Sequence, residues 1–185
     1  MNGSGLVPTN YYLPMDLPDL QAEARIARRY SEALIDDLSE DQVLWRPNEN
    51  SSAIGWHLGH QGAVNHFMVR NLTAATPSIN GDFDALFDSA TVEQQRGELP
   101  PVGEILQFRA DVAEQTMATV QRIADGDVGA PQQLTQIALG MVRAMINHEY
   151  QHAKWIGEVR HDLIGAEAPA PESTNLRNVE GYWMI

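Results

Sequence analysis

Residues 134–159 read LTQIALGMVRAMINHEYQHAKWIGEV, and the apolar positions of this stretch recur at steps of four and three. Steps of this kind form the stripe that one face of an α-helix turns toward a bundle core. The stripe consists of Leu134, Ala138, Met141, Met145, His148, His152, Trp155 and Val159. Two histidines therefore occupy core positions of a helix that we predict to run from about Pro131 to Leu163.

His148 and His152 lie four residues apart, so their side chains leave the same face of the helix about one turn from each other. This spacing lets a ring nitrogen of each histidine bind the same metal ion. Burying two imidazole rings without partners is costly, and a metal ion is one partner that removes the cost. The alternative is a pair of core histidines that form hydrogen bonds with neighbouring side chains.

Three further stretches carry helical periodicity, with Pro, Gly, Asn and Asp between them. We predict helices over 18–38, 53–72 and 102–124. Ser39 and Gln42 have the spacing of a capping box for a short helix that ends before Pro47. The long connection from Thr73 to Pro101 is expected to hold a short helix around 84–88. These elements predict an all-α protein, an antiparallel four-helix bundle with at least one long crossover connection.

The two ends of the chain differ in composition from the helical part. Residues 1–16 and the Ala/Pro-rich segment that begins at Gly165 lack the pattern of a core. We therefore divide the chain into an N-terminal arm (1–16), the bundle (17–164) and a C-terminal tail (165–185). The tail ends in Tyr182, Trp183, Met184 and Ile185, and an end this apolar is expected to dock on the rest of the protein.

Composition excludes several classes of function. The 185 residues contain 12 Lys+Arg and 25 Asp+Glu, which gives a net charge of −13 and argues against nucleic-acid binding. Cysteine is absent, so any metal ion must bind histidine, carboxylate or water. No apolar run approaches the ~18 residues of a membrane span and no targeting segment is recognised. We expect a cytoplasmic protein that does not bind membranes.

The second helix supplies another histidine at a core position. His60 lies at the centre of the apolar face that Trp56, Ala63 and Phe67 share with it. His57 is about 60° to one side, where it flanks a pocket, contacts a loop or lies at the helix border. His66 and His161 fall off the apolar stripes and are expected to be solvated.

Three segments of the chain resemble the DinB-like superfamily of metal-binding four-helix bundles. They are Ile54–His60, His148–His152 and the turn Leu38–Pro47, and the resemblance spans about 17–163. It implies that His60, His148 and His152 are the metal ligands. Similar pairs of motifs occur in the N-terminal domain of ergothioneine sulfoxide synthases and in mycothiol-dependent maleylpyruvate isomerases.

Three neutral imidazoles leave at least one coordination position of a divalent ion open, and zinc, nickel and ferrous iron all suit such ligands. A bound ion can acidify a water or a substrate thiol. Because the resemblance includes enzymes that use low-molecular-weight thiols, we expect a metal-dependent transferase or hydrolase that acts on a small molecule with such a thiol. Hydrogen-bond partners for the ligands are sought among Asn147, Glu149, Gln151 and Gln61.

A second hypothesis belongs to a different class. The protein would be a non-catalytic, stress-related module that binds a small ligand, with a structural metal or none. A structural metal site is normally closed by a fourth protein ligand, and His57 or Glu149 could supply it. In either case a homodimer is expected, formed through an apolar helix face or through the tail.

Overall fold

The computed structural model describes residues 15–73, 76–128 and 132–185. Its elements, in chain order, are α1 (Leu17–Ala33), α2 (Glu40–Leu44), α3 (Ile54–Thr73), α4 (Gly81–Leu86), the short 3-10 helix η1 (Glu93–Gln95), α5 (Val102–Ala124), α6 (Gln132–Ile164), β1 (Arg177–Val179) and β2 (Tyr182–Met184). The predicted all-α bundle with a long crossover connection is confirmed. Within the described residues, no helix is both long and apolar enough to cross a membrane.

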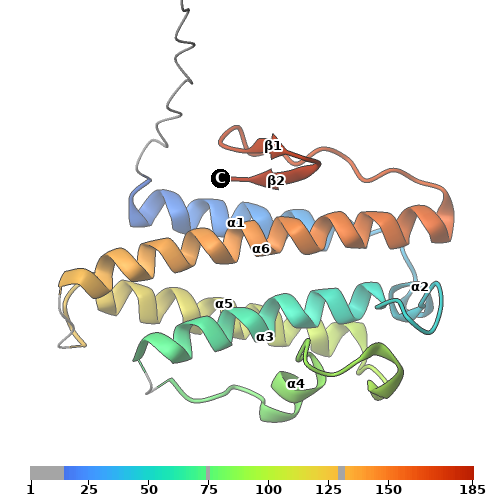
Figure 1. The fold of residues 1–185 in the computed structure, drawn as a ribbon, viewed down its shortest axis with the longest axis horizontal. Helices are drawn as coiled ribbons and strands as arrows, with labels where there is room; N and C mark the ends of the chain where they lie inside the picture. Colours follow the sequence, from blue (N-terminus) through green and yellow to red (C-terminus); the bar gives the residue numbers. More distant parts are fainter. Residues whose placement is uncertain (1–14, 74–75, 129–131) are drawn as a thin grey trace, which may run out of the picture.

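The four long helices α1, α3, α5 and α6 lie side by side along the molecule (Figure 1). α3 packs against both α5 and α6, and α1 packs against α6. The crossover with α4 and η1 returns the chain to the end of the bundle where α3 began, so α3 and α5 run in the same direction (Figure 1). α1 and α6 run in the opposite direction, and the neighbours α3 and α6 are therefore antiparallel.

α1 ends earlier than the predicted boundary at Leu38. The chain leaves the helix after Ala33 and continues in turns, with i→i+3 hydrogen bonds from Ile35 N to Glu32 O (3.1 Å) and from Leu38 N to Ile35 O (3.0 Å). Arg160 of α6 binds this turn, because its Nη1 donates to the Leu34 carbonyl oxygen at 3.0 Å and both of its Nη atoms contact Asp37. A partner from a distant helix thus replaces the last helical hydrogen bonds.

The other predicted boundaries are close to those observed, and the local capping explains them. Ser39 and Gln42 form the predicted capping box at the start of α2. α5 covers the predicted residues 102–124. α4 begins three residues before the short helix expected at 84–88, because Asn80 Oδ1 accepts hydrogen bonds from the amides of Asp82 and Phe83, both at 3.1 Å.

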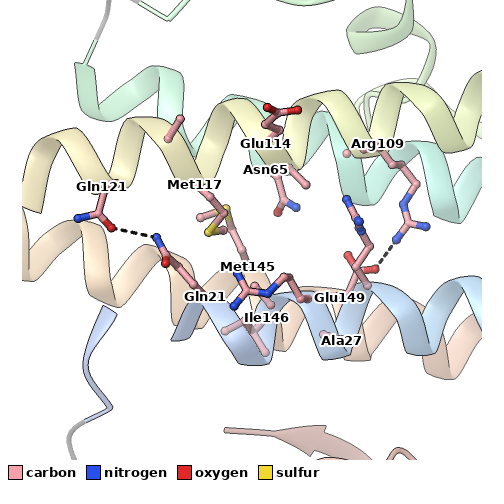
Figure 2. Close-up of a pocket in the computed structure, with 17 residues that line it drawn as sticks. Gln21, Ala27, Asn65, Arg109, Glu114, Met117, Gln121, Met145, Ile146 and Glu149 are labelled. Carbon is pink, nitrogen blue, oxygen red and sulfur yellow. Dashed lines mark hydrogen bonds and ion pairs between the residues drawn. The ribbon is translucent and has the colours of Figure 1, made fainter. Parts of the chain in front are cut away.

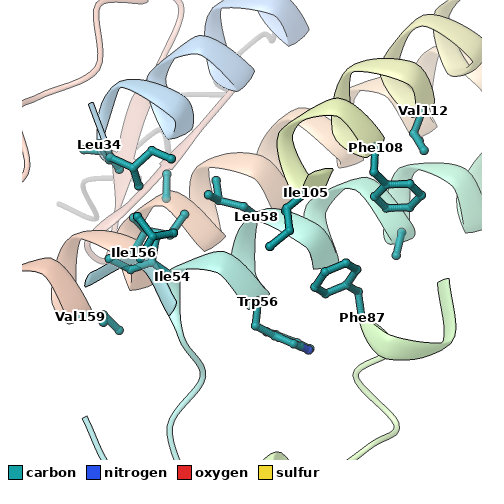
Figure 3. Close-up of a cluster of buried hydrophobic side chains, with 14 residues drawn as sticks. Leu34, Ile54, Trp56, Leu58, Phe87, Ile105, Phe108, Val112, Ile156 and Val159 are labelled. Atoms are coloured by element: carbon teal, nitrogen blue, oxygen red, sulfur yellow. The ribbon is translucent and has the colours of Figure 1, made fainter. Parts of the chain in front are cut away.

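The core consists of two apolar clusters. The first lies toward α2 and includes Leu58, Phe87, Ile105, Phe108 and Ile156 (Figure 3). The second lies toward the N-terminal end of α1 and includes Leu20, Ile123, Val142, Ile146 and Tyr150.

Ser31, Gln61, Arg109 and Glu149 form a polar layer between the two clusters, and each comes from a different long helix. All four are at least 94% buried. Gln61 Nε2 donates to Ser31 Oγ (3.1 Å) and to the Glu149 carbonyl oxygen (3.0 Å), and Arg109 forms an ion pair with the Glu149 carboxylate. The polar layer therefore connects all four helices at one level of the bundle.

The C-terminal tail docks on the bundle, as its apolar end predicts. β1 and β2 form an antiparallel hairpin, with Glu180 and Gly181 in the left-handed conformation that a two-residue hairpin turn requires. The hairpin was not predicted, since two three-residue strands are too short for a clear alternation. Ile185 is 95% buried and its amide donates to Asn147 Oδ1 of α6 at 2.9 Å. The homodimer stays a prediction.

Candidate metal centre

The antiparallel packing of α3 and α6 brings four histidines together. His57 and His60 come from α3, and His148 and His152 come from α6. One ring nitrogen each of His60, His148 and His152 lies within 4.8 Å of the other two. A group of nitrogens this close together can hold one metal ion. The structure thus brings together the three residues that the sequence selected.

Two of the three rings are already oriented by hydrogen bonds through their Nδ1 atoms. His60 Nδ1 lies 2.6 Å from the carbonyl oxygen of Phe87, so it carries the proton and donates. His152 Nδ1 lies 2.9 Å from His57 Nδ1. Contacts of this kind fix the ring orientation of metal-binding histidines and leave Nε2 for the ion.

His148 differs from the other two. Its ring is half-buried, whereas His60 and His152 are 94% and 96% buried. Its Nδ1 is buried and has no hydrogen-bond partner among the described residues. A buried imidazole nitrogen normally has a partner, so this atom fits a cluster that is completed by a bound ion.

Burial keeps the imidazoles in the neutral form that binds metals. It lowers the pKa of His148 to about 4 and, assisted by the nearby His60, that of His57 to about 3. Burial also lowers the pKa of His60 and of His152. In each case desolvation of the charged ring is the main cause. All four rings are therefore neutral near pH 7, which is the state required of a ligand.

Aromatic side chains wall the cluster. The Trp56 ring stacks on His60, with centroids 4.6 Å apart and planes 12° apart, and Trp155 packs edge-on against His152 at 4.7 Å. The Arg96 guanidinium lies 3.5 Å from the centroid of Trp56 and is held by Ser52 Oγ (2.6 Å) and the Thr91 carbonyl oxygen (3.1 Å). The crossover thus places a cation beside the cluster.

α4 supports the cluster from the side of His60. The ring of Phe87 follows α4 and packs so closely on Gly59 that a Cβ atom there would lie 2.3 Å from it. α4 is also tied to α3, because His66 Nδ1 contacts Asp84 Oδ2 at 2.8 Å.

The prediction that His66 is solvated is wrong, because the His66 side chain is 98% buried. The crossover that covers His66 could not be placed from helical periodicity. His161 is exposed, as expected.

Within the described part of the chain, none of the polar residues considered as partners for the ligands forms a hydrogen bond with the three rings. Gln61 and Glu149 belong to the polar layer, and Asn147 binds the C-terminal amide of Ile185. The observed partners are a backbone carbonyl from the crossover and the neighbouring His57. Sequence patterns carry no signal for the backbone carbonyl. The position of His57 near the apolar face of its helix was a partial signal for the contact that His57 makes.

A family model described as the DinB superfamily matches residues 23–156. The chain belongs to the DinB superfamily. The matched segment contains all of α3, α5 and the four clustered histidines and ends before the C-terminal tail. A search of curated proteins finds no match. The match establishes the family of this chain, and the reaction has to be inferred from the site.

Proposed function

We propose that His60, His148 and His152 bind one divalent ion, zinc, nickel or ferrous iron, and that this DinB superfamily protein is a metal-dependent transferase or hydrolase. The single observation that carries the proposal is the convergence of three neutral ring nitrogens within 4.8 Å, in an otherwise aromatic-walled site. The three nitrogen ligands are neutral, so they do not compensate the positive charge of a divalent ion bound to them. A bound ion would acidify a water or a thiol that joins it.

The residues around the histidines have separate roles in this proposal. The Phe87 carbonyl and His57 hold two rings with Nε2 directed away from these contacts. Trp56 and Trp155 exclude water from the buried side of the cluster. Arg96 adds positive charge near His60, which favours an anionic partner such as a deprotonated thiol.

The resemblance to DinB-like enzymes that use low-molecular-weight thiols supports a thiol reactant. The protein contains no cysteine, so a thiol that takes part in the reaction must arrive with the substrate. We therefore propose a low-molecular-weight thiol as one reactant. The non-catalytic alternative with a structural metal needs a fourth protein ligand, His57 or Glu149, that closes the site. Glu149 is engaged by Arg109 in the polar layer, which supports an open site over one closed by this carboxylate.

Calorimetric titration tests the proposal. Protein loaded with zinc or nickel is titrated with glutathione and, separately, with its S-methyl derivative. We expect glutathione to bind the metal-loaded protein and to bind the His148→Ala variant at least about tenfold more weakly. The S-methyl derivative should bind weakly to both proteins, because only a free thiol can lose its proton and bind the ion as a thiolate. Equal binding of the two compounds to the loaded protein would contradict the thiol assignment.

A further inference from the structure

A cleft separate from the three histidines opens between α1 and α5. Figure 2 shows these two helices as its walls, with α3 and α6 behind them as its floor. Its volume is about 570 Å³, which is within the range of small-molecule sites. α1 and α5 pack against other helices and hardly against each other, which leaves this side of the bundle open. None of the four clustered histidines lines the cleft.

Three arginines line the cleft in an otherwise acidic protein. Its lining includes Arg25, Arg28 and Arg109 together with Glu114 and Glu149, and Glu32 beside the lining also pairs with two of the arginines. Arg109 is 98% buried and is held by Glu149. Arg28 and Arg109 each lie 3.5 Å from the same oxygen of Glu32, so their guanidinium groups are close together. No described residue forms an ion pair with Arg25.

Polar groups mark both ends of the cleft, and the part between them holds apolar side chains together with Asn65 and Glu114 (Figure 2). Arg109 and Glu149 mark one end, and the hydrogen bond from Gln21 to Gln121 (3.3 Å) closes the other (Figure 2). Met117, Met145 and Ile146 line the part between (Figure 2). Arg109 and Gln121 are twelve residues apart on α5, which corresponds to about 18 Å. The cleft is therefore long enough for an extended chain.

Asn65 adds an unused polar group to this lining. Its side chain projects from α3 toward the cleft (Figure 2), and its Oδ1 is buried without a hydrogen-bond partner among the described residues. Buried acceptors of this kind are rare in folded proteins. A water held in the cleft can supply the missing donor.

We propose that the cleft binds an elongated amphipathic anion, a carboxylate with an unbranched apolar chain. The carboxylate binds at the arginine end, and the chain lies along the methionines toward Gln21 and Gln121. This site does not need the metal centre, since the histidines lie outside it. Binding in the cleft and metal binding can therefore be tested independently.

Calorimetry with decanoate, below its micellar concentration, tests the proposal on the full-length protein. We expect one decanoate per chain, and binding weakened about tenfold or more in the double variant Arg25→Gln/Arg28→Gln because charge-assisted contacts are lost. Decanol, which lacks the charge, is expected to bind the unmodified protein at least about tenfold more weakly. Ala113→Trp fills the cleft from α5 and should abolish decanoate binding. The midpoint of its thermal unfolding shows whether this variant is folded.

Two further variants serve as controls. Arg122→Gln removes an exposed arginine of α5 outside the cleft, and His148→Ala disrupts the metal centre alone. Both should bind decanoate within about twofold of the unmodified protein. Three results would each overturn the proposal. The protein does not bind decanoate, it binds decanol as tightly as decanoate, or Arg122→Gln loses as much decanoate affinity as the double variant. Loss of binding in His148→Ala would place the ligand at the metal centre instead.

Discussion

At the scale of single residues, the polar layer fixes how the four helices are aligned. Gln61 follows His60 directly and Glu149 follows His148, so the polar layer lies next to the candidate ligands. Sliding α3 or α6 by one turn would leave Gln61 and the Glu149 carboxylate buried without partners. Buried polar contacts are weak evidence for stability but are known to fix register. We infer that the polar layer sets the register in which the histidines of α3 and α6 meet.

Arg109→Met tests the polar layer. The substitution leaves the Glu149 carboxylate buried without its partner, and we expect it to lower the free energy of unfolding by about 3–5 kcal/mol. Urea denaturation measures the change. Lys154→Met, which removes the exposed ion pair with Glu158, is the control and should cost no more than about 0.5 kcal/mol. An equal loss of unfolding free energy in the two variants would show that the buried Arg109–Glu149 pair contributes no more to stability than an exposed ion pair.

At the scale of elements, α4 and the residue that follows it determine how His60 is oriented. Gly59→Ala would place a methyl group within the Phe87 ring and displace the carbonyl that binds His60. We expect a loss of about 1–3 kcal/mol in the free energy of unfolding from overpacking. If the histidines bind a metal ion, its affinity should fall about 10–100-fold as the orienting hydrogen bond is lost.

Gly140→Ala is the matched control for this prediction. Gly140 lies on an exposed part of α6, and a Cβ atom there meets no atom within 4 Å. Alanine should therefore stabilise the helix by about 0.5–1 kcal/mol without changing metal affinity. Denaturation and metal titration of both variants give the comparison. A Gly59→Ala protein with unchanged metal affinity would contradict the role of Phe87.

The turn after α1 gives a pH-dependent prediction. Hydrogen bonds from Arg160 lower the pKa of Asp37 below its ordinary value. A group whose pKa is lowered by folding stabilises the protein above its unfolded pKa, about 3.9 for Asp, and loses this contribution as the pH falls through the folded pKa. Asp37→Asn should thus be less stable than the unmodified protein at pH 7, with a smaller difference at pH 3. Urea midpoints at the two pH values measure it, and a difference independent of pH would refute it.

At the scale of the whole molecule, the C-terminal hairpin closes the second apolar cluster over α6. Ile185→Ala should lower the free energy of unfolding by about 2 kcal/mol or more, because a buried side chain is truncated. Val179→Ala, in the same hairpin but 48% exposed, should change it by less than about 0.5 kcal/mol. Thermal and urea unfolding compare the two. Similar small effects would mean that the tail does not stabilise the bundle in solution.

Much of this architecture was predictable because helical periodicity reports one face of each helix. It located the four long helices and selected His60, His148 and His152 from six histidines. The partners that orient the cluster were not predictable, since the Phe87 carbonyl and Arg96 come from a crossover without periodicity. The buried position of His66 and the early end of α1 depend on Asp84 and Arg160, contacts between segments far apart in the sequence. Tertiary contacts of this kind leave no local pattern.

The central claim is that the three histidines hold one divalent ion, and metal content tests it most directly. Full-length protein is purified without an affinity tag, incubated with zinc, nickel or ferrous iron, desalted and examined by mass spectrometry for metals. We predict about one ion per chain, its loss in His148→Ala and in His60→Ala, and its retention in the exposed-residue control His161→Ala. Protein without a bound ion, or with a metal content that His148→Ala leaves unchanged, would contradict the claim.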